Sequence, residues 1–326
     1  MSQSNPSVAP LLVPPAETLR DQDAATIDPA AHAVAGPPVT AWALDGPDLI
    51  VYAENATFLP TLPDESFTLI YVDPPFNTGR TQKRQVMTSV RTAAGEGDRI
   101  GFQGRSYATL RGDLHSYDDA FDDYWSFLEP RLREAWRLLA DDGTLYVHLD
   151  YREVHYAKVM LDAIFGRESF LNEIIWAYDY GARAKSRWPA KHDNILVYVK
   201  NPKTYHFDNA EVDREPYMAP GLVTAEKRAR GKLPTDVWWH TIVSPTGKEK
   251  TGYPTQKPEG ILRRIINASS REGDWVLDFF AGSGTTGAVA GALGRRFVCV
   301  DENPQSISVM SKRIPGATVL VSPDAP

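Results

Sequence analysis

From Asp48 onward, the chain alternates between short apolar runs and longer segments in which apolar residues recur about every 3.6 positions. Apolar runs of about 4–8 residues predict buried strands, and the longer period predicts amphipathic helices. This alternation is typical of an α/β fold, and we expect a single doubly wound, mostly parallel sheet with helices on both faces. The expected strands span residues 49–52, 67–72, 144–149, 194–199, 275–279 and 297–300.

Three amphipathic segments between these strands are expected to be helices. Pro130 lies inside the first and is expected to kink it or to begin a second helix, because proline lacks an N–H and clashes with the preceding turn. Gly166 is placed as a stop signal after the second. The helices are expected over residues 122–139, 152–165 and 258–270.

Three segments depart from this alternation. Residues 1–40 hold seven of the 25 prolines and little periodic apolar pattern, so we expect a disordered tail. Residues 80–118 are polar and rich in Gly and Arg, and residues 200–250 have only short patterns interrupted by proline. Both follow expected strands, where α/β proteins carry their substrate loops. We therefore expect these two segments to contact the substrate.

Composition narrows the classes of protein. No apolar run in the 326 residues approaches the ~18 residues of a spanning helix. The N-terminus lacks the pattern of a secretory signal, so a cytoplasmic protein is expected. A single cysteine, Cys299, excludes a disulfide framework and a thiolate zinc cluster within one chain. The seven histidines lack metal-binding spacing, so no metal is expected.

The net charge of −7 argues at first against a nucleic-acid partner, but the charge is unevenly distributed. Residues 80–111 carry +5, residues 181–203 carry +5 and residues 225–250 carry +3, so the rest of the chain carries −20. Basic residues thus gather in the two segments that break the alternation, 80–118 and 200–250, and in residues 181–203, most of which lie before the second of them. The candidate nucleic-acid contacts are Arg80, Lys83, Arg84, Arg183, Lys185, Arg187, Lys227, Arg228, Arg230 and Lys232.

A glycine-rich turn follows the expected strand 275–279. Gly282 and Gly284 let a ligand approach the backbone closely, and the helix that follows presents free N–H groups. Asp301 ends the next strand, 23 residues after Asp278, and suits a carboxylate that accepts hydrogen bonds from ribose hydroxyls. Together with Gly287, these glycines also match the spacing of the glycine motif that binds NAD or FAD. A dinucleotide-dependent oxidoreductase is therefore an alternative function. However, only 39 residues follow Gly287, too few for the second half of a dinucleotide fold.

A second motif, Asp73-Pro74-Pro75-Phe76, follows the expected strand 67–72. The two prolines fix the backbone and remove two N–H donors, which leaves carbonyls and the Asp73 carboxylate at the strand end. Such a corner accepts hydrogen bonds and donates few, which suits a substrate amino group. Phe76 offers a flat face on which an aromatic ring can stack. Taken alone, the motif is more typical of a proline turn that ends a strand.

Together, the two motifs resemble those of the amino-group DNA methyltransferases, which methylate adenine N6 or cytosine N4. The resemblance covers nearly all of residues 45–315. The 73–76 motif matches that family's catalytic motif, and the run from Asp278 to Gly284 matches its S-adenosylmethionine motif. The catalytic motif comes first along the chain, which is similar to the circularly permuted β group of the family. The run 255–258, before a helix, resembles the element that helps to enclose the methionine of the cofactor.

The resemblance implies a methyl transfer from S-adenosylmethionine to a flipped base in double-stranded DNA. Asp at position 73 favours adenine N6, with cytosine N4 as the alternative. Methyl transfer to cytosine C5 is excluded because it requires a nucleophilic thiolate, and Cys299 lies in an expected cofactor-side strand. A methyltransferase that acts on RNA or on protein glutamine and a non-catalytic DNA-binding module are lesser alternatives.

The resemblance also implies how the chain is divided. Residues 41–200 would form the catalytic half, with 80–118 as a DNA-contacting insertion, residues 201–250 the target recognition region, and residues 251–326 the cofactor-binding half. A homodimer and a cognate restriction endonuclease are further partners that the family suggests. The catalytic residues would be Asp73, Pro74, Pro75 and Phe76, and the cofactor ligands Lys257, Asp278, Phe279, Ala281, Gly282, Ser283, Gly284, Thr285 and Asp301.

Overall fold

The computed structural model describes residues 41–77, 82–91, 99–100, 106–117, 124–179, 184–244, 246–323 and 325. For 82–91, 99–100 and 106–117 it describes the backbone alone. The expected N-terminal tail, residues 1–40, lies outside the described residues. None of the helices in the described ranges is both long enough and apolar enough to cross a membrane.

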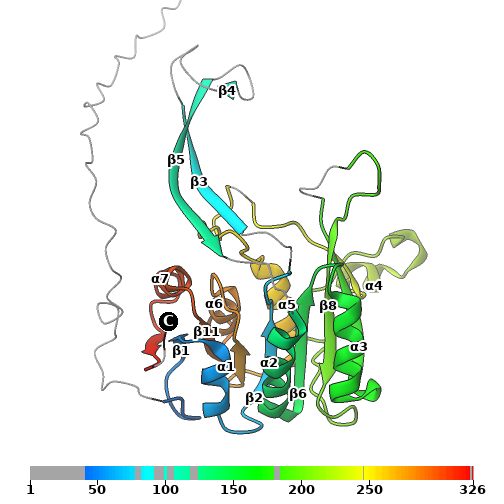
Figure 1. Ribbon diagram of the computed structural model, residues 1–326. Helices are drawn as coiled ribbons and strands as arrows, with labels where there is room; N and C mark the ends of the chain where they lie inside the picture. The colour runs from blue at the N-terminus through cyan, green and yellow to red at the C-terminus, as the bar shows by residue number, and fades with distance from the viewer. Residues whose placement is uncertain are drawn as a thin grey trace, which may run out of the picture.

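Within the described residues, nine strands form one sheet in the order β12-β1-β11-β10-β2-β6-β8-β7-β9 (Figure 1). The pairs β6–β8 and β8–β7 are antiparallel, and all other neighbours in this order are parallel. The expected mostly parallel sheet is confirmed. Its strands are β1 (Leu49–Tyr52), β2 (Phe67–Val72), β6 (Leu139–Leu149), β7 (Phe170–Ala177), β8 (His192–Val199), β9 (Val237–Trp239), β10 (Trp275–Asp278), β11 (Arg296–Asp301) and β12 (Thr318–Val321).

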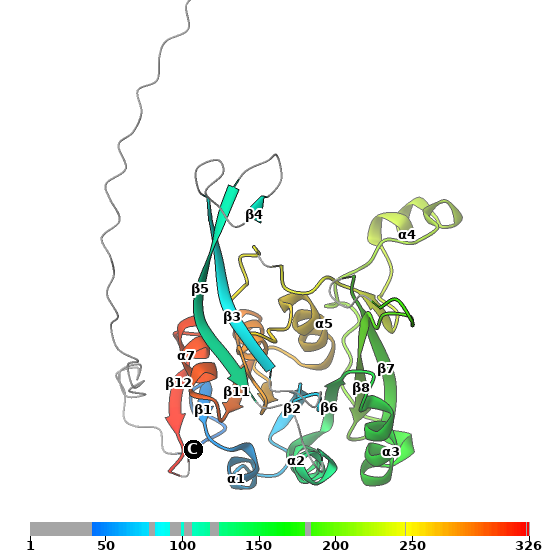
Figure 2. The ribbon, with the colours of Figure 1, turned by 45° about the horizontal axis from the view of Figure 1, so that its top comes forward.

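Helices cover both faces of the sheet, as Figure 2 shows, with α2 and α3 on one side and α5 and α7 on the other. Leu49 and Val51 of β1 pack into the core with α2 and α3, whereas Ile50 packs into the core with α5, α6 and α7. Alternate residues of a strand point to opposite faces, so a strand buried on both faces is apolar throughout. The helices are α1 (Asn55–Phe58), α2 (Tyr124–Leu138), α3 (Val154–Phe165), α4 (Ala225–Arg230), α5 (Glu259–Ser269), α6 (Thr285–Ala292) and α7 (Pro304–Arg313), with 3-10 turns at Leu59–Thr61, Arg167–Ser169 and Pro220–Leu222.

Each of the six expected strands and three expected helices corresponds to an observed element. The expectation that Pro130 begins a second helix is wrong, because α2 runs through it as one helix. Leu128 and Leu132, on either side of the proline, are fully buried, and their packing offsets the missing hydrogen bond. Strands β7, β9 and β12 were not expected from the apolar pattern. Each lacks a long apolar run: β7 is only partly apolar, β9 has three residues, and β12 is a short strand at the edge of the sheet.

A small antiparallel sheet occupies part of the segment 80–118. Its strands are β3 (Gln82–Arg91), β4 (Arg99–Ile100) and β5 (Ser106–Tyr117), in the order β3-β5-β4. The long strands β3 and β5 project away from the main sheet in both views (Figures 1 and 2). β3 begins shortly after β2 ends, so this arm arises at the carboxyl edge of the main sheet.

Gly287 allows helix α6 to lie close against strand β11. A Cβ at this position would lie 2.7 Å from Cys299 Sγ and 3.0 Å from atoms of Phe297 and Ile314. The third glycine of the motif therefore serves helix–sheet packing. Cys299 is fully buried beneath it, and burial raises the pKa of its thiol.

We expect Gly287→Ala to destabilise the protein by about 1–3 kcal/mol, because the added methyl overpacks the contact between α6 and β11. Denaturant unfolding measures the change. Gly316→Ala is the matched control, since none of the described atoms lies within 4 Å of the added methyl. If both variants unfold at the same denaturant concentration, α6 does not require a glycine at this contact.

Candidate active site

The two sequence motifs meet at the carboxyl edge of the sheet. Strands β2 and β10 are parallel neighbours, with Leu69 opposite Val276 and Ile70 opposite Leu277. Asp73 directly follows β2, and Asp278 ends β10. The parallel pairing brings two residues that are about 200 positions apart to the same edge.

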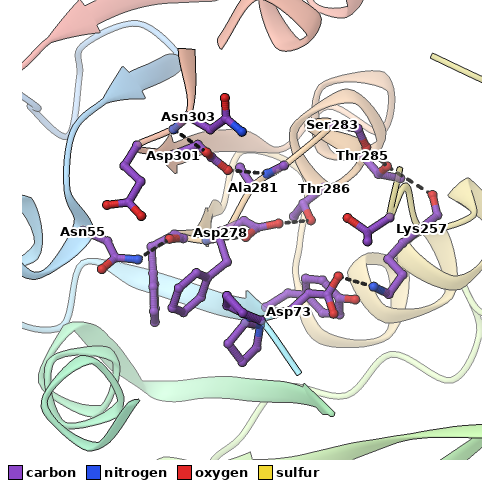
Figure 3. Close-up of a pocket in the computed structure, with 18 of the residues that line it drawn as sticks. Asn55, Asp73, Lys257, Asp278, Ala281, Ser283, Thr285, Thr286, Asp301 and Asn303 are labelled. Carbon is purple, nitrogen blue, oxygen red and sulfur yellow. Dashed lines mark hydrogen bonds and ion pairs between the residues drawn. The ribbon is translucent and has the colours of Figure 1, made fainter. Parts of the chain in front are cut away.

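A cavity of about 340 Å³ opens at this edge. All four predicted catalytic residues line it, and Figure 3 labels Asp73 among them. The predicted cofactor ligands also line it, with the exception of Gly284, which lies at the N-terminus of α6 in the left-handed conformation with φ +69°. Its lining includes Asp73, Pro74, Pro75, Phe76, Lys257, Asp278, Phe279, Ala281, Gly282, Ser283, Thr285 and Asp301.

The two oxygens of the Asp73 carboxylate have different surroundings. Oδ2 accepts a hydrogen bond from the ammonium of Lys257 (Figure 3). Oδ1 is buried, accepts no hydrogen bond from any described residue, and lies 4.0 Å from Nδ1 of His148. The ring of Phe76 lies beside this corner, with its centroid 5.1 Å from the Lys257 ammonium. One carboxylate oxygen is therefore left to accept a hydrogen bond from a ligand.

A buried hydrogen-bonded chain supports the corner from behind. Nδ1 of His148 lies 2.7 Å from the hydroxyl of Tyr71, and its Nε2 lies 3.3 Å from Oδ2 of Asp193. The hydroxyl of Tyr178 donates to Oδ1 of Asp193 at 3.0 Å. Burial alone would raise the pKa of Asp193, but its contacts with His148, Lys257 and Tyr178 lower it overall. The sheet thus places the ionised carboxylate of Asp193 behind Asp73.

Two buried carboxylates hold the glycine turn. Asp278 accepts from Thr286 Oγ1 at 2.5 Å and from the backbone N–H of Phe280 at 3.1 Å. Asp301 accepts from the backbone N–H of Gly282 and of Asn303, both at 2.8 Å. Burial raises the pKa of Asp278 to about 7 and that of Asp301 to about 6, although these hydrogen bonds lower both. Asp301 therefore anchors the turn and remains ionised at neutral pH.

The glycine turn at Gly282 lies close against the ring of Tyr253. Gly282 has φ +51°, a conformation that L side chains rarely adopt. A Cβ there would lie 3.2 Å from the ring of Tyr253, which lines the same cavity. The hydroxyl of Tyr253 accepts a hydrogen bond from Ser306 at 3.0 Å. The turn and this ring form one wall of the cavity.

Several cavity residues were missed by the sequence analysis. Asn55 donates to the carbonyl of Phe279 at 2.8 Å and accepts from Arg131 at 2.5 Å. Tyr253 and Asn303 also line the cavity. Asn303 follows Asp301 closely, and Tyr253 precedes the run 255–258. Their positions next to two motifs could have identified them as candidate site residues. Asn55 and Arg131 lie outside any motif, and only the fold brings them to the site.

The predicted DNA contacts fall into separate groups. Lys185 and Arg187 are exposed in the segment between β7 and β8, which joins these strands at the same edge as the cavity. Three more, on α4, are exposed, and Figure 2 shows α4 lying beyond β7. Lys232 is half-buried and pairs through its backbone with Glu215. The three residues on α4 are Lys227, Arg228 and Arg230. Arg80 and Arg183 lie outside the described residues. For Lys83 and Arg84, both in β3, only the backbone is described.

Comparison with solved structures identifies the class of fold. The M1.HpyAVI–SAM complex has a TM-score of 0.51 and 20% identity, over 82% of this chain and 98% of that one. The cytosine-N4-specific PvuII DNA methyltransferase has a TM-score of 0.52 and 14% identity, over 88% and 97%. With a cavity lined by an acceptor corner and a glycine turn, the fold is that of an S-adenosylmethionine-dependent methyltransferase.

The chain belongs to the DNA methylase family, whose N6/N4-type model matches residues 67–312. Its similar relatives include the DNA adenine methyltransferase YhdJ of Escherichia coli K12, with 32% identity over 81% of this chain and 82% of that protein. The type II methyltransferase M.HpaI of Haemophilus parainfluenzae is 30% identical, over 78% and 70%. Membership of this family favours methyl transfer over the dinucleotide chemistry that the glycine spacing left open. Among the described residues, no group of His, Cys, Asp and Glu forms a metal site.

The cavity fits S-adenosylmethionine. Asp301 places a carboxylate at the end of β11, where it would accept hydrogen bonds from the ribose hydroxyls. Gly282 leaves room for the ligand against the backbone, and the acidic lining that includes Asp278 suits a cationic molecule. Asp73, whose buried Oδ1 accepts no hydrogen bond from the described residues, lines the same cavity.

We expect the affinity for S-adenosylmethionine to fall as the pH falls through about 6. The pKa of Asp301 is about 6, so acid protonates the carboxylate and weakens it as an acceptor. Asp278, with a pKa of about 7, titrates in the same range, so the comparison with Asp301→Asn isolates the contribution of Asp301. Isothermal titration between about pH 5.5 and 8 measures both proteins.

Asp301→Asn should bind the cofactor more weakly at neutral pH, by roughly 1–3 kcal/mol, and should lose the part of the dependence centred near pH 6. Asp45→Asn, an exposed change, is the control and should match the unaltered protein. An Asp301→Asn variant that keeps the full pH dependence would remove Asp301 from the set of cofactor ligands.

Proposed function

We propose that this protein methylates the exocyclic N6 of adenine in DNA at a specific sequence. The observation that carries the proposal is the Asp73 carboxylate, whose buried Oδ1 accepts no hydrogen bond from the described residues; Asp73 and Phe76 line the same cavity as the glycine turn. The adenine preference is supported by Asp at position 73 and by the relative YhdJ, which is named a DNA adenine methyltransferase. Cytosine N4 is the alternative. The PvuII enzyme shares the fold alone and does not weigh on the choice of base.

The reaction requires a base outside the double helix. A base in the stack cannot reach a cavity at the edge of the sheet, so the target nucleotide is flipped out at a cost of a few kcal/mol, about the energy of the stacking and pairing given up. Phe76 stacks on the flipped base, and Oδ1 of Asp73 and the carbonyl of Pro74 accept its two amino hydrogens. These hydrogen bonds turn the nitrogen lone pair out of conjugation with the ring.

S-adenosylmethionine, when bound, supplies a methyl group on a positively charged sulfur. The amino nitrogen forms the new N–C bond as the C–S bond breaks, and the nitrogen then gives up one proton. Oδ1 of Asp73 already accepts that hydrogen and is the first base to receive the proton, which passes on to water. No covalent link to the protein forms, and Cys299 takes no part because it is fully buried in β11.

Double-stranded DNA is proposed to lie across the carboxyl edge of the sheet. The arm of β3 and β5, the exposed Lys185 and Arg187, and the exposed cations of α4 are the proposed contacts. Residues 201–250 remain the proposed target recognition region, 41–200 the catalytic half and 251–326 the cofactor-binding half. A cytoplasmic location, a homodimer and a cognate restriction endonuclease belong to the same proposal.

Asp73→Asn should lower the rate of DNA methylation by about 10²–10⁴-fold, because an amide presents a weaker acceptor and no base. Transfer of a labelled methyl group to DNA measures the rate, and isothermal titration with S-adenosylmethionine should show cofactor binding retained. Asp45→Asn is the control. Retention of the methylation rate by Asp73→Asn would refute the assigned role. Mass spectrometry of the digested product, which separates N6-methyladenine from N4-methylcytosine, decides the base.

Simultaneous replacement of Lys227, Arg228 and Arg230 by Ala should weaken DNA binding and its dependence on salt. The slope of log K against log[salt] should fall by about 0.9 for each phosphate that the protein no longer neutralises. A triple variant of Arg133, Arg167 and Lys312 removes the same charge from other exposed positions and serves as the control. Equal slopes for the two triple variants would place the DNA away from α4.

A further inference from the structure

A partly buried ion pair joins the two halves of the active site. The ammonium of Lys257 and the carboxylate of Asp73 are 184 positions apart in the chain, and their side chains are only 12% and 15% exposed. The resemblance to the family assigns Lys257 to the element that encloses the cofactor. In this structure its ammonium instead contacts the catalytic carboxylate (Figure 3).

We propose that Lys257 is a positioning residue that holds Asp73 by Oδ2, so that Oδ1 alone is presented to the amino group of the target base. This inference rests on the proposed function and deepens it. A free carboxylate can exchange its two oxygens by rotation about the bond to Cβ, whereas a carboxylate tied at one oxygen keeps the other in place. The buried Oδ1, with no hydrogen bond from the described residues, is the oxygen that this arrangement leaves for the substrate.

Lys257 is itself held in place. Its carbonyl accepts a hydrogen bond from Thr285 Oγ1 at 3.1 Å, which ties it to the start of α6. Pro258, the next residue, caps the N-terminus of α5. The ammonium also lies 5.1 Å from the centroid of the Phe76 ring, a cation–π distance. Lys257 therefore links the glycine turn to both the acceptor and the stacking residue of the catalytic corner.

The charges around Asp73 require a cation. Asp193 lies behind it through His148, and Asp278 lies across the cavity, so two other carboxylates act on the same region. The polar groups that face the corner also include Tyr71 and Tyr253, and burial, together with the charge of Asp73, raises the pKa of both. The described cations that line the cavity are Lys257 and Arg131, and Arg131 is paired with Glu54.

Lys257 thus supplies the positive charge beside Asp73. Burial and neighbouring like charges disfavour a negative charge at this corner, and the ammonium beside Asp73 offsets them. One contact therefore both compensates the charge of Asp73 and orients its carboxylate. This dual effect can be measured in the pH dependence of the methyl-transfer step.

The test compares Lys257→Met, which keeps the length of the side chain without its charge, with Lys257→Arg, which keeps the charge. Single-turnover methylation of DNA is measured against pH at saturating S-adenosylmethionine, and cofactor affinity is measured by titration. Lys312→Met, an exposed change on α7, is the control and should leave rate, profile and affinity unchanged. Unfolding curves confirm that each variant is folded.

Lys257→Met should lower the rate by about 10²-fold at neutral pH. It should also move the acidic limb of the profile to higher pH, because the opposite charge beside Asp73 is removed. The dissociation constant for the cofactor should stay within about threefold. Lys257→Arg should keep the acidic limb near that of the unaltered protein, and this expectation tests the inference even if Lys257→Met does not fold.

Two outcomes overturn the inference. An unchanged saturating rate and pH profile in Lys257→Met, with weaker cofactor binding, would make Lys257 a cofactor ligand and not a positioning residue. An acidic limb that moves equally in Lys257→Arg and Lys257→Met would show that its charge does not act on Asp73. Failure of the unaltered protein to methylate DNA would overturn the proposed function itself and is therefore distinguishable from both.

Discussion

The parallel pairing of β2 with β10 is the constraint on which the site depends. Each strand is buried on both faces, and each ends at a residue that carries chemistry, Asp73 after β2 and Asp278 at the end of β10. A shift of one residue in this pairing would turn every side chain of one strand to the opposite face, which the two apolar cores do not tolerate. The burial that stabilises the sheet therefore also fixes the distance between the acceptor corner and the glycine turn.

The polar groups beneath the cavity show how this edge is kept rigid. Asp278 and Asp301 are buried carboxylates with raised pKa values, and such groups cost free energy unless hydrogen bonds satisfy them. Here the hydrogen bonds come from the start of α6, from the turn at Gly282 and from Asn303. Both carboxylates use some of their lone pairs to hold the glycine turn in place. The lone pairs that remain can accept hydrogen bonds from a ligand. Stability and binding are therefore coupled in the same side chains.

The sequence predicted the elements that have a strong pattern of their own. Continuous apolar runs indicated the central strands, and the 3.6-residue period indicated α2, α3 and α5. These elements bury whole faces against the two cores, so the spacing of their own apolar residues reveals them. β7 and β9 were missed, because their places at one side of the sheet depend on pairing with β8 and with each other. The antiparallel arm was expected only as a substrate-contacting insertion. The contact of Lys257 with Asp73 joins residues 184 positions apart and leaves no local signal in the sequence.

The distribution of charge follows from the two ligands that the enzyme must hold at one edge. S-adenosylmethionine is cationic at its sulfur, and the cavity lining includes Glu54, Asp73, Asp278, Asp301 and Glu302. DNA is a polyanion, and exposed cations lie on the loop between β7 and β8 and on α4. A basic cavity would repel the cofactor, and an acidic rim would repel the phosphates. A net charge of −7 is therefore compatible with a DNA-binding enzyme, because the negative charge near the site belongs to the cofactor cavity and the positive charge to the surface around it.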